Sequence, residues 1–314
     1  MDIDARSRYK QDEEERLRHQ IHRAETSFDT SPKELSDLLY SLAFVLVAQG
    51  RYKTAEAVAW RLLESHKSQS NDSDYDEGTL KALYVLGEVF GHQGLHTKAE
   101  RLHRRVATGR EKVLGPEHPD TLRSITDLGT TLGDLARYKE AEAMLRRALE
   151  VQKRVLGQED PLTLDNVDNL AFVLRNLGRY EEAEVMQRQT LEVRERTLGR
   201  EHPDTLMGVD NLGSVLTNLG RYEEAEAMHR RALESSEKIL GKEHPETLLG
   251  KYCFAYLLTK QRRYDESTVL YESACAGFRK VLGEDHPSTR SCQEDYTRML
   301  ASKRQGSLNH PGVE

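Results

Sequence analysis

Cysteine, long apolar segments and excess positive charge are all scarce in this sequence. The three cysteines are odd in number and show no C-x-x-C spacing, which favours reduced thiols in a reducing compartment over a disulfide framework. No apolar run approaches the roughly 20 residues that a membrane-spanning helix needs, and the acidic N-terminus is too polar for a signal peptide. We therefore expect a cytoplasmic protein.

The charge balance and the motif content argue against further classes of function. With a formal net charge of -7 and 32% charged residues, the sequence lacks the basic character of proteins that bind nucleic acid or anionic membranes. The phosphate-binding segment G-x-x-x-x-G-K-[ST] is also absent, which argues against a P-loop ATPase. We expect no nucleic-acid partner, no membrane partner and no cofactor.

One phrase, in its fullest form Leu-Gly-x-Glu-His-Pro-Asp-Thr-Leu, recurs along most of the chain. Each copy begins 42 residues after the one before. The copies begin at Leu114, Leu156, Leu198, Leu240 and Leu282. A second phrase, Gly-Arg-Tyr-Glu-Glu-Ala-Glu, keeps the same period at residues 178–184 and 220–226. A sustained period of this size is typical of a solenoid, in which each repeat packs on its neighbours.

Each repeat has the pattern of two amphipathic helices. Apolar residues three and four positions apart form a stripe along the first helix, as between Leu164 and Leu177. A small residue recurs in the middle of this helix, where we expect the second helix to approach closely. These small residues are Ala43, Gly87, Gly129, Ala171, Gly213 and Ala255. The connecting phrase places a glycine where the second helix ends and a proline where the next repeat begins.

The sequence predicts an all-α fold, an α-α superhelix of about six helix pairs with a C-terminal capping helix. The repeat array is expected at residues 31–303, interrupted by a polar loop at 65–78. Residues 1–30 are a charged segment in which the spacing of Leu17 and Ile21 favours a short capping helix. Residues 304–314 are expected to form a polar tail.

The helix pairs resemble tetratricopeptide repeats. The small and large apolar positions that carry this resemblance are Leu128, Gly129, Leu132, Ala141, Leu145 and Ala148. The 42-residue period and the two phrases resemble the repeats of kinesin light chains more than the usual form of about 34 residues. The resemblance covers roughly residues 33–303. It implies a non-catalytic adaptor or scaffold that binds a peptide segment of a partner protein in a concave groove.

The resemblance also implies which residues line that groove, because the first helix of each pair faces it in this family. Transferred by register, the groove residues are Tyr84, Arg123, Asp168, Asn169, Phe172, Arg175, Asn176, Asp210, Asn211, Asn218, Tyr252 and Tyr256. Amides at equal places in consecutive repeats could hold an extended peptide backbone, and the aromatic rings could fill side-chain pockets. Alternatively, the amides are solvated or bond across repeats.

Other interpretations of the groove stay open at this stage. An enzyme or small-molecule receptor could use Tyr84, Arg123, Asp168, Arg175 and Tyr256 as a polar lining, which would require a deep cavity. Self-association through the terminal repeats into a homo-oligomer is a third alternative. No metal site is expected at the histidines of the turns, His118, His202, His244 and His286, because sites one repeat apart cannot converge on one ion. Cys253 is expected to be a packed thiol, since no base can be assigned to it.

Overall fold

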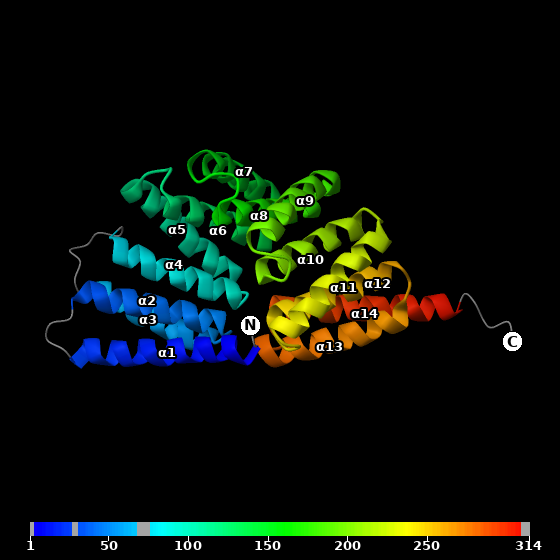
Figure 1. Cartoon of the computed structure of the whole chain (residues 1–314), viewed down its shortest axis with the longest axis horizontal. Coiled ribbons are helices and arrows are strands. Elements are labelled where there is room, and N and C mark those ends of the chain that lie inside the picture. Colours follow the sequence, from blue (N-terminus) through cyan, green and yellow to red (C-terminus); the bar gives the residue numbers. More distant parts are fainter. Residues whose placement is uncertain (1–2, 27–30, 68–75, 309–314) are drawn as a thin grey trace. The chain divides into compact units, whose positions relative to one another are not determined.

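The computed structural model describes residues 3–26, 31–67 and 76–308, which contain fourteen helices joined by turns (Figure 1). The helices are α1 (Ile3–Thr26), α2 (Pro32–Ala48), α3 (Tyr52–Lys67), α4 (Glu77–His92), α5 (His96–Leu114), α6 (Pro119–Asp134), α7 (Tyr138–Val155), α8 (Pro161–Asn176), α9 (Tyr180–Thr197), α10 (Pro203–Asn218), α11 (Tyr222–Ile239), α12 (Pro245–Lys260), α13 (Tyr264–Leu282) and α14 (Pro287–Leu308). Most of the predicted polar loop, residues 68–75, and residues 309–314 of the predicted tail lie outside the described residues.

The helices alternate as the first and second members of six repeats, which we call A and B helices. α2, α4, α6, α8, α10 and α12 are the A helices, and each is followed by its B helix. The all-α fold with six pairs and a C-terminal helix is therefore as predicted. The last helix, α14, continues to Leu308, five residues beyond the predicted end of the array. Within the described ranges, no helix combines the length and apolar character that crossing a membrane requires.

The recurring turn is explained by its backbone. Gly199 follows α9 with a φ of 92°, a left-handed conformation that strains other residues. Pro203 then opens α10, where its missing N–H costs no hydrogen bond. The histidine between them caps the helix, because Nδ1 of His202 accepts a hydrogen bond from the backbone N–H of Asp204 at 3.3 Å. His118, His244 and His286 make the same contact, so the turn histidines are N-caps.

Close approach of the paired helices explains the small residue in mid-helix. A Cβ atom at Gly129 would lie 2.6 Å from the side chain of Leu145 on the B helix. At Gly213 it would lie 2.9 Å from the ring of His229. Both distances are shorter than packed atoms tolerate, so glycine is needed there despite its cost of about 1 kcal/mol in a helix.

The chain divides into two compact units, Met1–Val173 and Leu174–Glu314, and α8 begins in the first and ends in the second. In the first unit, Leu17 and Ile21 of α1 are buried in the core beside Leu39 of α2. In the second unit, Cys292 and Met299 of α14 are buried with residues of α12 and α13. A helix at each end of the array therefore covers the apolar side of its neighbouring repeat.

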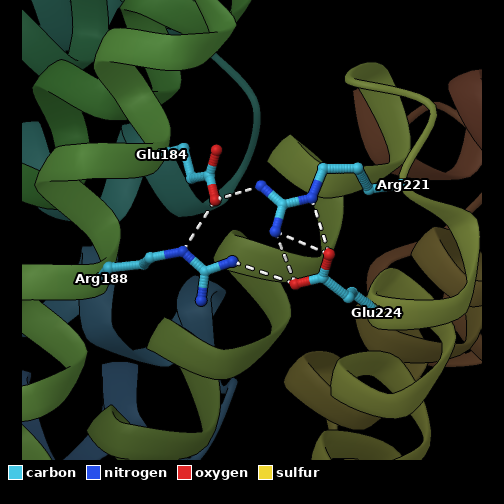
Figure 2. A network of polar contacts seen from close by, with 4 residues as sticks. All are labelled: Glu184, Arg188, Arg221 and Glu224. Carbon is cyan, nitrogen blue, oxygen red and sulfur yellow. Dashed lines mark hydrogen bonds and ion pairs between the residues drawn. The ribbon is translucent and has the colours of Figure 1, made fainter.

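The second recurring phrase forms a network of ion pairs between consecutive B helices. Glu184 of α9 accepts from Arg221, which precedes α11, at 2.6 Å and from Arg188 at 2.7 Å. Glu224 of α11 accepts both from Arg221 and, at 3.2 Å, from Arg188 (Figure 2). We call this set the outer ion network. Glu224 was expected to stabilise the helix dipole, and the network is an additional reason for its charge.

Candidate functional site

The A helices of neighbouring repeats contact one another within each unit: α2 meets α4 in the first unit, and α12 meets α10 and α14 in the second. We call the side of the A helices that carries the predicted groove residues the A face. The exposed members are Arg123, Phe172, Asn176 and Asn218, and the half-buried ones are Asn169, Arg175, Asp210, Asn211, Tyr252 and Tyr256. Tyr84 and Asp168 are only 4% and 6% exposed. Ten of the twelve residues are therefore accessible, and two lie beneath the surface.

Tyr84 belongs to the core of the first unit. Its ring lies 6.1 Å from that of Phe44, and the guanidinium of Arg110 lies 4.6 Å from its centroid. Its hydroxyl is hydrogen-bonded to Arg123 and to the carboxylate of Asp127. Burial raises the pKa of Tyr84, so the phenol stays protonated. Tyr84 therefore orients charged side chains and is not a surface anchor.

In the second unit, Asp210 fixes a buried histidine. Its Oδ1 lies 2.7 Å from Nδ1 of His229, which is 1% exposed and stacks on Phe254. The neighbouring Cys253 is hydrogen-bonded to Ser214 and Asp210. Burial and the charge of Asp210 raise the pKa of the Cys253 thiol, which disfavours the thiolate that a nucleophile needs. This geometry agrees with the prediction of a packed thiol.

The remaining polar side chains of the A face in the second unit are held at its surface. Asn218 donates to the carbonyl of Ser214 at 2.7 Å, and the hydroxyl of Tyr252 donates to Asp295 of α14 at 2.6 Å. The Nζ atom of Lys260 lies 4.9 Å from the ring centroid of Tyr256. The A face thus presents amide, phenol and ammonium groups in fixed positions.

Two hollows lie away from the predicted groove residues. One, of about 680 Å³, lies between α13 and α14 and is lined in part by Glu272, Arg279 and Gln293. Another, of about 420 Å³, is lined in part by Asp37, His66 and Lys81. Neither contains the polar lining that was considered for an enzyme or a small-molecule receptor.

Sequence reasoning missed a cluster of three metal-ligand types in the first unit. Glu88 of α4, His103 of α5 and Asp127 of α6 each place one potential ligand atom within 4.8 Å of the others. Only the turn histidines were considered as ligands, because they recur visibly. His103 occupies the B-helix position that faces the small mid-helix residue, here Gly87, and that register is the signal that could have found it.

Comparison with known proteins agrees with this fold. The tetratricopeptide repeat family matches residues 37–59, 78–154, 167–204, 205–246 and 253–288, well over half of the chain. No curated protein matches the sequence.

Solved structures with similar folds include repeat proteins of the kinesin light chain type. A variant of nearly identical TPR-like repeats from a kinesin light chain candidate of Podosopora anserina is 25% identical, with a TM-score of 0.51 over 64% of this chain and 95% of that one. BtubC from P. vanneervenii is 18% identical, with a TM-score of 0.55 over 77% of this chain and 93% of that one. NprR, solved with its cognate peptide NprX, is 14% identical, with a TM-score of 0.68 over 91% of this chain and 82% of that one.

Family and fold together support the general role of a protein-interaction adaptor. The sequence match, the 42-residue period and the six helix pairs lead to one conclusion. The chain belongs to the tetratricopeptide repeat family, and its repeats are of the kinesin light chain type.

Proposed function

We propose that this protein is a cytoplasmic adaptor that binds an extended peptide segment of a partner protein on its A face. The observation that carries the proposal is the repetition of accessible amides. Asn169 and Asn211 are half-buried at equal places in consecutive A helices, and Asn176 and Asn218 are exposed at a second pair of equal places. Most other polar residues near the middle of these helices are buried.

Amides suit this task because each offers donors and acceptors to a peptide backbone. Asn211 and Asn218 lie two turns apart on α10, and Asn218 keeps its amide oxygen as an acceptor after donating to Ser214. The rings of Tyr252 and Tyr256 lie on the neighbouring helix α12 and can pack against peptide side chains. Binding of a peptide in this way would combine backbone recognition with aromatic anchoring.

Two structural neighbours support the choice of ligand. NprR was solved with its cognate peptide, and a Rap protein was solved with competence and sporulation factor. Both are only 14% identical to this chain and share its fold. The three free cysteines are compatible with the proposed cytoplasmic location.

Affinity purification with mass spectrometry from the native cell tests the proposal. The bait is the wild-type chain, and the comparison is a variant that combines Asn211→Ala, Asn218→Ala and Tyr256→Ala. We expect specific proteins to be recovered with the wild type and lost with the variant. A matched control carries Val185→Ala and Val269→Ala, two residues of the B helices α9 and α13 that are 58% and 65% exposed.

The control should recover the same proteins as the wild type. Circular dichroism must first establish that all three chains have the same helical content and melting temperature. Equal recovery by the wild type and the folded A-face variant would overturn the proposal. Light scattering over a range of concentrations tests self-association separately, since a homo-oligomer would recover mainly its own copies.

A further inference from the structure

The cluster of Glu88, His103 and Asp127 is built from three consecutive helices of the first unit. Nε2 of His103 lies 3.6 Å from Oε1 of Glu88, and one ligand atom of each residue lies within 4.8 Å of the others. Ligand atoms around a zinc ion, at about 2.0–2.2 Å from it, are about 3.3 Å apart. Small side-chain rotations would therefore bring the three groups to coordination distance.

Two atoms of the cluster lack hydrogen-bond partners although water does not reach them. Among the described residues, neither Nδ1 of His103 nor Oδ2 of Asp127 has a partner, and both are fully covered. The imidazole of His103 is 2% exposed. Buried polar atoms without partners cost about 1–3 kcal/mol each, so such atoms in a native structure call for an explanation.

The charges of the cluster point in the same direction. Burial, together with repulsion from Asp127, raises the pKa of Glu88, and burial raises the pKa of Asp127. The fold therefore holds two carboxylates where their negative charges are poorly stabilised. Burial lowers the pKa of His103 to about 4, so its ring is neutral at physiological pH, which is the form that binds metals.

The cluster is particular to one repeat junction. The same three positions can be followed along the chain in steps of 42 residues. They are occupied by Thr130, Leu145 and Asn169, then by Phe172, Gln187 and Asn211, then by Ser214, His229 and Cys253, and finally by Tyr256, Tyr271 and Asp295. Only the first set combines an imidazole with two carboxylates. Stacking of the repeats does not require this combination, because the other junctions stack without it.

We infer that Glu88, His103 and Asp127 form a binding site for a divalent first-row transition metal ion such as Zn²⁺. One nitrogen and two carboxylate oxygens match the donors that zinc takes, and they leave a coordination position for water or a ligand. The nitrogen disfavours Mg²⁺ and Ca²⁺, which prefer oxygen donors alone. Two carboxylates also balance the charge of the ion.

Tyr84 acts as a positioning residue for this site. Its hydroxyl is hydrogen-bonded to the carboxylate of Asp127, as the outer partners of metal ligands commonly are. The positive charges that face the cluster, Arg110 and Arg123, are engaged elsewhere. Arg110 donates to Ser124 and to the carbonyl of Asp120, and Arg123 is hydrogen-bonded to Tyr84. The negative charge of Asp165 acts on Asp127 from α8.

Titration calorimetry of the metal-free full chain with Zn²⁺ tests the inference. We expect one equivalent to bind, and we expect Asp127→Asn and Glu88→Gln to weaken that binding by at least about a hundredfold, since each removes a ligand. Tyr84→Phe should weaken it by about 10–100-fold. Both amide variants preserve shape and remove a poorly stabilised charge, so they should fold. Co²⁺ in place of Zn²⁺ gives a visible spectrum that should change in His103→Gln.

Two controls separate this site from weak binding at the surface. His118→Ala removes a half-exposed histidine of the neighbouring turn and should leave the zinc affinity within about twofold. Mg²⁺ should give no heat of binding at the same concentration. If the wild type binds no zinc equivalent, or if Asp127→Asn binds as tightly as the wild type, the inference is wrong. Neither result bears on peptide binding at the A face.

Discussion

The outer edge of a repeat junction is nearly the same in both units, whereas its interior differs. Arg137 in the first unit bonds Glu100 at 2.9 Å and Glu140 at 2.7 Å, as Arg263 in the second unit bonds Glu226 and Glu266 at 2.6 and 2.7 Å. The interior of one junction holds Glu88, His103 and Asp127, and the corresponding residues of another are Ser214, His229 and Cys253.

This difference separates two roles of polar residues in a solenoid. Residues that keep the same contacts at each junction hold consecutive B helices in register, because the same geometry must be rebuilt every 42 residues. Residues that vary between junctions are not needed for stacking and can serve an individual site. Function is therefore expected in the interior clusters and on the A face, and stability at the outer edge and in the turns.

The largest effect on stability is expected from a methyl group added in the interior. Gly213→Ala would place a Cβ atom 2.9 Å from the ring of His229, and we expect a loss of about 1–3 kcal/mol in the free energy of unfolding. Gly208→Ala on the same helix is the matched control, because its nearest neighbour atom lies at 3.5 Å. That variant should gain about 0.5–1 kcal/mol. Urea unfolding measures both, and equal effects would contradict the close approach.

A smaller loss is expected when the polar partner of the interior histidine is removed. Asp210→Ala leaves Nδ1 of His229 without its partner at 2.7 Å, which should cost about 1–2 kcal/mol in urea unfolding. Asp127→Asn in the first unit should cost less than Asp210→Ala, because burial already disfavours the charge of Asp127. The opposite ranking would show that the two interior clusters do not differ as described.

The turns at the end of the A helices contain two exceptions that allow a test of their constancy. Ala136 and Arg262 have φ values of 57° and 61°, where other repeats have glycine. Ala136→Gly and Arg262→Gly should each raise the free energy of unfolding by about 0.5–1 kcal/mol, because glycine relieves the left-handed strain. Gly220→Ala, at a φ of 75°, should do the reverse. A loss of stability in both glycine variants would contradict this account.

The smallest effect is expected at the outer ion network. Arg221→Met removes three hydrogen bonds to Glu184 and Glu224, but these side chains are accessible to water and screened by salt. We expect the melting temperature to fall by about 1–3 °C at low ionic strength. Scanning calorimetry in 1 M salt should show a smaller difference. A difference that is independent of salt would mean that packing, and not charge, is lost.

Much of the fold could be predicted from the sequence because its signals are periodic. The glycine of the turn, the proline that opens each A helix and the mid-helix Gly129 recur at a fixed spacing and have local causes. The N-cap role of His202 was not predicted, since histidine is an uncommon cap and its Nδ1 contact depends on the side-chain rotamer.

The candidate site could be predicted only in part. Register placed Asn211 and Asn218 on the accessible side of α10, where they lie. It also placed Tyr84 and Asp168 in the groove, although both are buried, because register does not report how far neighbouring helices cover a side chain. The cluster at His103 was missed because its members come from three helices and converge only in the folded chain.

The most direct test of the central claim is the affinity of one peptide for three forms of the protein. The peptide is taken from the captured partner, and fluorescence anisotropy gives its dissociation constant for the wild type, the A-face variant and Arg221→Met. The account predicts a loss of at least about tenfold for the A-face variant, or roughly 1.4 kcal/mol, and a change within about twofold for Arg221→Met. Equal affinity of the wild type and the A-face variant, or a larger loss in Arg221→Met, would contradict it.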